Sequence, residues 1–354
     1  LKDKDIRTRT HAAIALGKLD SAKALQALIA AAVENNNIDA YFRHAVVMGL
    51  STVPAKELLN LSQHKSAAAR LVVLLALRRQ LHPGISVFLN DSDAFIATEA
   101  ALAIHDDCSI PAALPALAEA LERRDIRGES FWRRAINANF RVGRPVDAQR
   151  LAAFVLRQDI PDNMKTTALA CLAQWAKPPV LDAVEGRYRE ITPRSAEPAI
   201  AALQSISAAL LKTETSKVQT IFVRALYMLK AKSLVALLTD FYSTENASGL
   251  LRREVLIAMH QMVHPELGKF VKMGLADRNN DLRSQAIKYA SAAGISVYEL
   301  ASQILDSGTV LEKRAALNTL VKTKDKRVDV LLEKLLQKLK SNEIDKHIAL
   351  DVLQ

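Results

Sequence analysis

The sequence predicts an all-α fold, a right-handed solenoid of about eleven or twelve stacked helical hairpins. One phrase recurs along the chain: a polar or basic residue, a small residue three places on and a large apolar residue seven places on, as in Arg9-Ala12-Leu16 and Lys313-Ala316-Leu320. Its copies lie about 30 residues apart, a period typical of stacked helical repeats. Half of the 354 residues are hydrophobic and only 5% are aromatic, which suits Ala- and Leu-rich helices. Because each repeat packs only against its neighbours, an array of this length needs no single large core.

The second helix of each hairpin is the easier one to recognise, because its apolar residues recur at i, i+3, i+4 and i+7. We expect these helices at about 5–19, 40–53, 67–81, 94–106, 130–142, 163–176, 196–211, 219–231, 249–262, 280–293, 309–323 and 344–354. The first helices are shorter and are expected at 22–33, 56–62, 111–121, 146–156, 233–242, 265–275, 297–305 and 328–340. Two of them begin with a proline in the first turn, Pro111 and Pro265, where the missing N–H costs nothing.

Short polar residues precede many second helices, where their side chains can accept a hydrogen bond from a free helix N–H. Examples are Asp93, Asp162 and Asn280. Glycines near second-helix ends suit left-handed caps or a close approach of two helices. They are Gly17, Gly49, Gly143 and Gly294.

One stretch interrupts the repeats. Residues 176–198 contain four prolines and a glycine, which stop a regular helix. We therefore expect an N-terminal array over 1–178, an irregular Pro-rich insertion over 179–195 and a C-terminal array over 196–354. A short helix near 181–188 is expected inside the insertion.

Charge and hydropathy limit the classes of partner. The net charge of +10 makes an acidic partner plausible. The longest strongly apolar run, residues 71–77, is far shorter than the roughly 20 residues of a membrane-spanning helix, so no membrane span is expected. Cys108 and Cys171 fit neither a disulfide framework nor a metal cluster, and we expect free, mostly buried thiols.

No catalytic or cofactor motif is present. The chain has no Gly-rich phosphate loop, no Gly-x-Ser-x-Gly and no Cys-x-x-Cys-His haem motif. His260 and His264 have the i, i+4 spacing of zinc-binding helices but lack the glutamate that follows the first histidine in metalloproteases. Asp106 and Asp107 lie at an expected helix end, where they are interpreted as solvated turn residues. We therefore predict no catalytic, cofactor-binding or metal-binding residue.

The pattern Asp-x-x-Arg-x-x-Ala-x-x-Ala-Leu resembles the second helix of HEAT repeats. In such repeats the Asp and Arg commonly connect neighbouring hairpins, which suits Asp5, Arg9, Arg43, Arg70, Asp281 and Arg283. A richer surface is expected at 131–141, where arginines and aromatic residues alternate and could contact phosphates or bases. The candidate partner-binding residues are Trp132, Arg134, Arg141, Arg187 and Tyr188.

Several phrases resemble one specific family. They are Tyr41-Phe42-Arg43-His44-Ala45-Val46-Val47-Met48, Ala103-Ile104-His105-Asp106, Ile110-Pro111-Ala112-Ala113-Leu114-Pro115, Arg134-Ala135-Ile136-Asn137-Ala138-Asn139-Phe140-Arg141-Val142-Gly143 and Trp175-Ala176-Lys177-Pro178. Over about residues 5–210 they are similar to the HEAT segment of large secreted proteins of planctomycete-like bacteria. In that family a propeller similar to glucose/sorbosone dehydrogenases precedes the repeats and a c-type cytochrome domain follows them.

The resemblance implies a periplasmic or cell-surface redox assembly whose chemistry lies in the flanking modules. The full-length protein would then be a sugar or PQQ-type dehydrogenase with haem c elsewhere in its chain. No cofactor or catalytic residue is carried over to this segment, because it contains neither module.

Three functional hypotheses follow. The first is a non-catalytic scaffold that docks a protein partner or flanking domains of the same polypeptide. The second is a nucleic-acid-binding HEAT protein, similar to a DNA glycosylase, with a basic concave face and strongly salt-dependent affinity. The third is an enzyme of the HEAT-like chromophore-lyase class, which would need a pocket with convergent polar groups.

Overall fold

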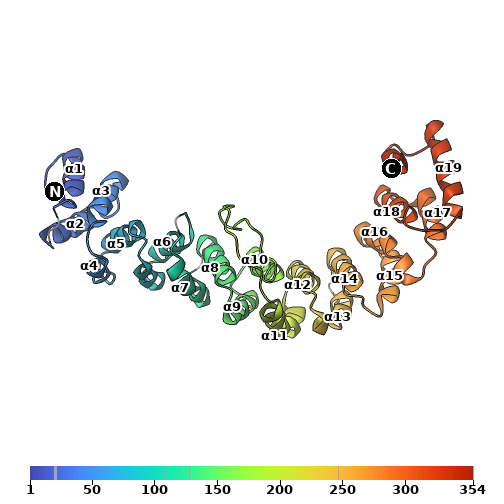
Figure 1. Cartoon of the computed structure of the whole chain (residues 1–354), viewed down its shortest axis with the longest axis horizontal. Coiled ribbons are helices and arrows are strands. Elements are labelled where there is room, and N and C mark those ends of the chain that lie inside the picture. The colour runs from blue at the N-terminus through green and yellow to red at the C-terminus, as the bar shows by residue number, and fades with distance from the viewer. Residues whose placement is uncertain (20–21, 108, 127, 246, 354) are drawn as a thin grey trace. The chain divides into compact units, whose positions relative to one another are not determined.

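Helices follow one another along the whole chain in the computed structural model, which describes residues 1–19, 22–107, 109–126, 128–245 and 247–353 (Figure 1). Contacts divide the chain into two compact units, residues 1–198 (unit 1) and 199–354 (unit 2). Each unit is a stack of helical hairpins, so the predicted all-α solenoid is confirmed. None of the described helices is long and apolar enough to span a bilayer.

In unit 1 the second helices form one row and the first helices form the other (Figure 1). The second helices are α1 (Ile6–Leu16), α3 (Ala40–Leu50), α5 (Ala67–Arg79), α6 (Ala94–His105), α8 (Glu129–Val142) and α10 (Asp162–Ala173). The first helices, with 3-10 turns labelled η, are α2 (Ala22–Asn35), α4 (Ala55–Leu59), η1 (Pro83–Asn90), η2 (Pro111–Ala113), α7 (Leu114–Glu119), η3 (Ala120–Glu122) and α9 (Pro145–Val155).

Unit 2 continues the same pattern. Its second helices are α12 (Ser216–Met228), α14 (Gly249–Gln261), α16 (Asn280–Lys288), α18 (Val310–Leu320) and α20 (Ala349–Leu353). Its first helices and 3-10 turns are α11 (Glu197–Thr213), η4 (Lys232–Leu234), α13 (Leu237–Ser243), α15 (Leu267–Leu275), η5 (Ser291–Ala293), α17 (Val297–Ser307) and α19 (Arg327–Lys340). The expectation that 196–211 is a second helix is wrong, because α11 lies on the side of α13 (Figure 1).

Local capping explains where many second helices begin. The Asp39 carboxylate accepts the N–H of Phe42, and Asp93 accepts that of Phe95, as predicted for Asp93. The cap of α16 is Asn279 rather than Asn280, and Asp162 lies within the first turn of α10. A short polar acceptor therefore specifies several starts, while the exact capping residue shifts by one position.

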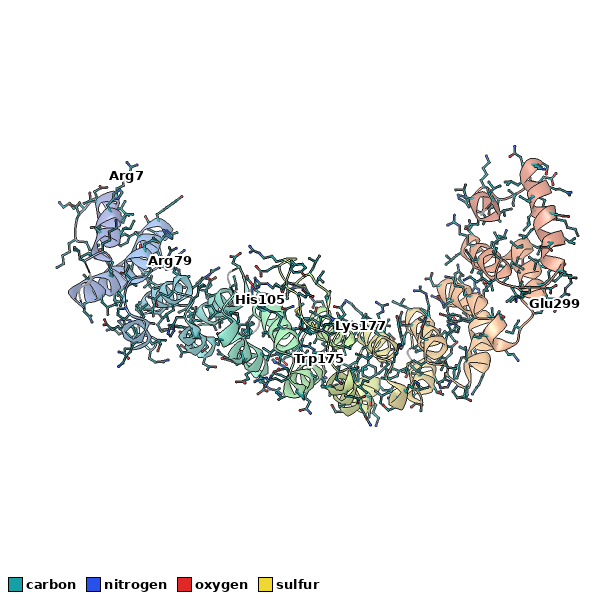
Figure 2. The ribbon with its side chains drawn as sticks, viewed as in Figure 1. Arg7, Arg79, His105, Trp175, Lys177 and Glu299 are labelled. Atoms are coloured by element: carbon teal, nitrogen blue, oxygen red, sulfur yellow. The ribbon has the colours of Figure 1, made fainter. Side chains whose placement is uncertain are left out.

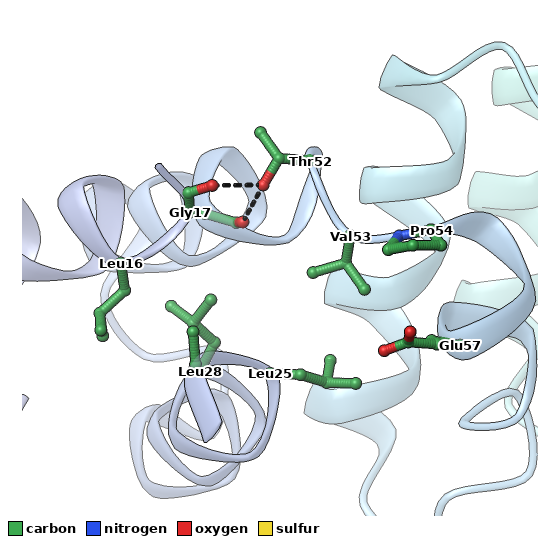
Figure 3. A pocket seen from close by; sticks show the side chains of 10 residues that line it. Leu16, Gly17, Leu25, Leu28, Thr52, Val53, Pro54 and Glu57 are labelled. Atoms are coloured by element: carbon green, nitrogen blue, oxygen red, sulfur yellow. Dashed lines mark hydrogen bonds between the residues drawn. The ribbon is translucent and has the colours of Figure 1, made fainter. Parts of the chain in front are cut away.

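Two glycines allow the first repeats to pack backbone against backbone. A Cβ added to Gly49 would lie 2.5 Å from the carbonyl O of Ala13, and one added to Gly17 would lie 2.6 Å from the carbonyl O of Gly49. The Thr52 hydroxyl donates to the Gly17 carbonyl O at 2.6 Å and closes this contact (Figure 3). Helices α1 and α3 can therefore approach closely only because both positions lack side chains.

Arginine–carboxylate pairs connect successive hairpins. Arg70 of α5 contacts Asp91, which precedes α6, through Nε–Oδ2 and Nη2–Oδ1 distances of 2.7 and 2.9 Å. Equivalent pairs between sequential elements are Arg134–Asp106, Arg150–Glu122, Arg224–Glu254, Arg252–Asp277 and Arg283–Glu312. The predicted connecting role therefore fits Arg70, Arg283 and also Arg9, which pairs with Glu34 of α2 in the next helical hairpin. Arg43 instead bonds Asn37, Asp5 caps α1, and Asp281 lies in the first turn of α16.

Candidate functional site

The segment between α10 and α11 is the largest departure from the repeats. Leu181 and Tyr188 form an antiparallel bridge there, so the expected short helix over 181–188 is wrong. The Asp182 carboxylate accepts the N–H groups of Val184 and Glu185 at 2.8 and 3.0 Å, and Gly186 adopts φ +69°. These local bonds favour a tight hairpin over a helix. The hairpin, residues 178–194, belongs to unit 1.

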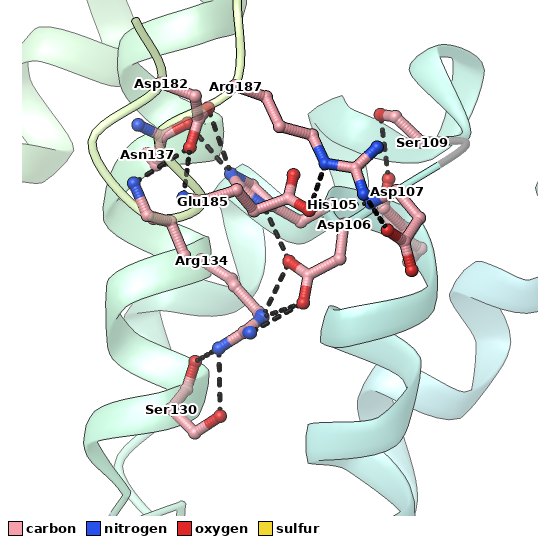
Figure 4. Close-up of polar contacts among 12 residues, drawn as sticks. His105, Asp106, Asp107, Ser109, Ser130, Arg134, Asn137, Asp182, Glu185 and Arg187 are labelled. Carbon is pink, nitrogen blue, oxygen red and sulfur yellow. Dashed lines mark hydrogen bonds and ion pairs between the residues drawn. The ribbon is translucent and has the colours of Figure 1, made fainter.

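The hairpin is fastened to the end of α6. Glu185 Oε1 accepts the backbone N–H of Asp107 at 2.9 Å, and Arg187 Nη2 contacts Asp107 Oδ1 at 2.5 Å. Arg189 Nη2 donates to the Asp107 carbonyl O at 3.2 Å and to Glu185 Oε2 at 2.5 Å (Figure 4). Asp107 is therefore a solvated turn residue, as predicted, that is also the attachment point for three hairpin side chains.

A buried histidine joins α6, α8 and the hairpin. The His105 side chain is 0% exposed, and its Nδ1 lies 2.9 Å from Asp106 Oδ1. Its Nε2 lies 2.9 Å from Asn137 Oδ1 of α8 and 3.7 Å from Asp182 Oδ2 of the hairpin (Figure 4). Three separate segments thus meet at one imidazole. Figure 2 labels His105 and so shows where this cluster lies along unit 1.

An ion pair between Asp106 and Arg134 completes this polar cluster. Arg134 Nε lies 2.9 Å from Asp106 Oδ1 and Nη2 lies 2.6 Å from Oδ2, which is a bidentate arrangement. Burial alone would raise the pKa of the Asp106 carboxyl, but the hydrogen bonds from His105 and Arg134 outweigh it and lower this pKa to about 2. Asp106 therefore stays ionised down to strongly acidic pH.

The structure brings four of the five predicted partner-binding residues to this region but gives them different roles. Arg134 is engaged with Asp106, and its side chain is 14% exposed. Arg141 donates to the His105 carbonyl O at 3.4 Å and to Ser109 Oγ at 3.2 Å. Arg187 pairs with Asp107 while its side chain stays 56% exposed, and Tyr188 is 69% exposed with its hydroxyl donating to Glu190.

Trp132 does not serve as predicted. It is only 6% exposed and packs edge-on against Phe154 of α9, with ring centroids 6.3 Å apart. A side chain buried against α9 in this way offers almost no surface to a partner, so its predicted role in docking is wrong. The alternation of apolar and polar residues in 131–141 reflects the packing of α8 instead.

Sequence reasoning missed the acidic members of the cluster. They are Asp106, Asp107, Asp182 and Glu185, together with His105. One available signal was the dense charge of 182–190, where five charged residues occur beside a buried-looking Leu181. Such a segment needs oppositely charged partners elsewhere in the chain if it is to be ordered.

The cluster contains the elements of a cation site. Among the described residues, His105, Asp106 and Glu185 can each bring one ligand atom within 4.8 Å of the others. Asp106 is already contacted by Arg134 and Glu185 by Arg189, so a metal ion would have to displace guanidinium groups. This chemistry suits an ion-paired clamp better than a metal centre.

The cavities give two further surfaces. A void of about 70 Å³ beside Leu16, Leu25 and Leu28 (Figure 3) is too small for an organic ligand. An open groove of about 470 Å³ runs between the end of α8 and the hairpin, lined in part by Arg141, Arg189 and Arg194.

The remaining histidines and cysteines of interest have packing roles. His260 stacks on Tyr289 with centroids 4.1 Å apart, and His264 Nδ1 accepts the N–H of Glu266. Cys171 is a free, buried thiol as predicted, and burial raises its pKa to about 12. Cys108 lies outside the described residues.

The chain is similar to known proteins only at the level of distant solved structures. No protein-family model matches the sequence, and no curated protein matches it. The chain is similar to a solved structure of the complex of CpcE and CpcF of phycocyanin lyase from Nostoc sp. PCC7120, with 19% identity over 72% of this chain and 94% of that chain, at a TM-score of 0.34. It is also similar to an engineered protein, with 17% identity over 100% of this chain and 96% of that chain, at a TM-score of 0.37.

Proposed function

We propose that this chain is a non-catalytic repeat scaffold that docks a protein partner through the hairpin at 178–194. The observation that carries the proposal is that the turn of the hairpin is fastened to the end of α6 while apolar and aromatic side chains on its two strands are exposed. Three hairpin side chains contact Asp107, while Val180, Leu181 and Tyr188 are 50%, 54% and 69% exposed. Apolar groups held at a surface by an ion-paired frame are typical of a recognition element.

Preorganisation is what such a hairpin contributes. A free loop loses conformational entropy when it binds, whereas a loop already fixed by hydrogen bonds and ion pairs loses little. Tyrosine adds a large contact area with only two rotatable side-chain bonds, and Arg187 places an exposed cation beside it. The expected partner surface is therefore partly apolar and acidic.

The proposed setting is a larger extracytoplasmic protein, periplasmic or at the cell surface. There the hairpin would contact a flanking dehydrogenase-like propeller or a c-type cytochrome domain, and haem would be bound outside this segment. Support comes from the ordered phrases over about 5–210, one of which forms most of α8, the helix whose Phe140 carbonyl O accepts a hydrogen bond from Arg194 of the hairpin. Repeated strands before Leu1 or a Cys-x-x-Cys-His motif after Gln354 in the intact gene product would support this setting.

A crosslinking experiment tests the docking role. A photo-crosslinking amino acid replaces Tyr188 in the intact gene product, and the same residue at Tyr41, which is 86% exposed elsewhere in unit 1, is the matched control. We expect crosslinks from position 188 to one defined surface of a flanking domain or of a purified partner, and none to that surface from position 41. Equal crosslinking from both positions, or crosslinks that do not converge on one surface, would refute the docking role.

A second candidate, nucleic-acid binding, is favoured by one specific groove. Between α3 and α5 an open groove of about 270 Å³ is lined by Arg43, His44, Arg78 and Arg79. A nucleic-acid backbone bound there would lose affinity as the salt concentration rises, because binding releases the counterions of the neutralised phosphates. Binding to a mixed-sequence DNA duplex that falls steeply between 50 and about 200 mM NaCl, and is lost in Arg79→Gln, would support this function over protein docking.

A further inference from the structure

The groove between the end of α8 and the hairpin is lined by three arginines and one glutamate. Its lining includes Arg141 of α8 and Arg189 and Arg194 of the returning hairpin strand, with Thr192 and Glu190 at the same surface. The groove is open to solvent and has a volume of about 470 Å³. It can therefore admit a small polar ligand without any movement of the helices.

Two of these arginines lack a carboxylate partner among the described residues. The contacts of Arg141 are the His105 carbonyl O and Ser109 Oγ, which are neutral. Arg194 donates to the carbonyl O atoms of Trp175 and Phe140 at 3.0 and 2.6 Å, and its guanidinium lies 3.8 Å from the centre of the Trp175 ring. Both guanidinium groups are thus held in place by neutral acceptors and an aromatic face.

The neighbouring arginines differ in this respect. Arg134 contacts Asp106, Arg187 contacts Asp107 and Arg189 contacts Glu185. The C-terminal end of α8 supplies about half a negative charge and Glu190 adds one more at the lining, which together remain below the charge of the two guanidinium groups that make no ion pair. Burial is the largest cause of the lowered pKa of Arg141 and of Arg194; the charges of Asp182 and Glu185 oppose it at Arg141, and that of Asp147 opposes it at Arg194.

Glu190 is the acidic side chain in the lining, and it has another partner. Its Oε2 accepts the hydroxyl hydrogen of Tyr188 at 2.9 Å. It makes no ion pair with Arg141 or Arg194, so it leaves their guanidinium hydrogens available. The Thr192 hydroxyl is exposed at the same surface and adds a neutral donor.

We propose that this groove binds a tetrahedral oxyanion with two negative charges, of the phosphate or sulfate type. Two guanidinium forks match the charge of a dianion, and they approach it from different segments, α8 and the hairpin. A planar monovalent carboxylate would satisfy one fork and leave the other cation unneutralised. Binding would also connect the hairpin to α8 by a bridge that is separate from the Asp107 contacts.

Thermal unfolding of the whole chain tests the proposal, because a ligand that binds only the folded state raises its stability with concentration. Sodium phosphate and sodium sulfate are titrated at constant ionic strength against sodium chloride and sodium acetate. We expect a saturable increase in melting temperature with the two dianions and none with chloride or acetate. Arg141→Gln should weaken the apparent affinity at least about tenfold, whereas Arg141→Lys should keep part of it.

Arg133→Gln is the matched control, because Arg133 lies on the same helix but pairs with Glu129 outside the groove. It should leave the anion response unchanged. No saturable response to phosphate or sulfate in the unsubstituted chain overturns the proposal, whatever the variants do. Equal responses to acetate, or equal losses in Arg141→Gln and Arg133→Gln, overturn it as well. Circular dichroism of each variant confirms that it is folded before the titrations are compared.

Discussion

Replacing Asp106 with asparagine removes the carboxylate that links α6 to α8 beneath the hairpin. The lowering of its pKa from the ordinary value of 3.8 to about 2 corresponds to about 2.4 kcal/mol of stabilisation. The side chain is 15% exposed, and solvent screening reduces this contribution to about 1–2 kcal/mol. Asparagine also leaves the Arg134 guanidinium without a charged partner, so we expect unit 1 to lose about 2 kcal/mol at pH 7.

The assay can be confined to unit 1. Both tryptophans of the chain, Trp132 and Trp175, lie in that unit, so tryptophan fluorescence during urea unfolding reports on it alone. Glu129→Gln is the matched control, because the Glu129–Arg133 pair on α8 is exposed and worth only about 0.5 kcal/mol. The Asp106→Asn midpoint should therefore fall well below that of Glu129→Gln.

The pH dependence gives a second readout with a definite sign. Because the pKa of Asp106 is lower in the folded state than in the unfolded chain, its contribution is fully present above about pH 4 and is lost as the pH falls towards 2. The stability difference between the unsubstituted chain and Asp106→Asn should shrink over that interval. A difference no larger than that of the Glu129→Gln control, or one that stays constant from pH 7 to pH 2.5, would refute the role assigned to this ion pair.

Three further predictions concern the frame of the repeats. Gly49→Ala should destabilise the first repeats by about 1–3 kcal/mol, because its Cβ would meet the Ala13 carbonyl O at 2.5 Å, and faster hydrogen exchange in α1 and α3 but not in α10 would check it. Arg70→Ala should cost about 3 kcal/mol by leaving Asp91 buried and unpaired, and Asp91→Asn in the same chain should restore part of the loss, measured by thermal unfolding. In a Cys108→Ser chain the Cys171 thiol should resist Ellman's reagent at pH 8 until urea unfolds unit 1, because burial raises its pKa to about 12; rapid labelling of the folded chain would contradict its burial.

Most of the helices could be predicted because each one follows from the spacing of apolar residues within its own segment. The i, i+3, i+4 and i+7 pattern placed most second helices within three residues, since burying one face of a helix needs only that spacing; α16 ends five residues earlier than expected and α20 begins five residues later. Two other differences have physical reasons. The 3-10 turn η1 was not expected because Pro83 and Gly84 disfavour a helix, and the side of α11 could not be decided because all rows of a solenoid share the same apolar period.

The candidate site could be predicted only in part. Arg134, Arg141, Arg187 and Tyr188 were found because arginine and aromatic residues stand out in a sequence. Their partners were missed because the decisive contacts join Asp107 to residues about 80 positions later. Nothing local in Asp106-Asp107 shows that Asp106 pairs with Arg134 or that the exposed Asp107 holds the hairpin. Only the packing of α8 and of the hairpin against the end of α6 brings these groups together.

Part of the net charge of +10 is unavailable to an acidic partner, because many arginines form ion pairs inside the chain. The arginines that connect successive hairpins, such as Arg70 and Arg283, are neutralised by carboxylates of the next repeat and are not available to a phosphate backbone. Among the described residues, other arginines are exposed, such as Arg79, or half-buried without an ion pair, such as Arg141 and Arg194 beside the hairpin. The groove at Arg79 is where a polyanion would be attracted, whereas the two half-buried guanidinium groups beside the hairpin favour a single small oxyanion. The distribution of paired and unpaired arginines, rather than their number, is therefore the property of this chain that discriminates between its possible ligands.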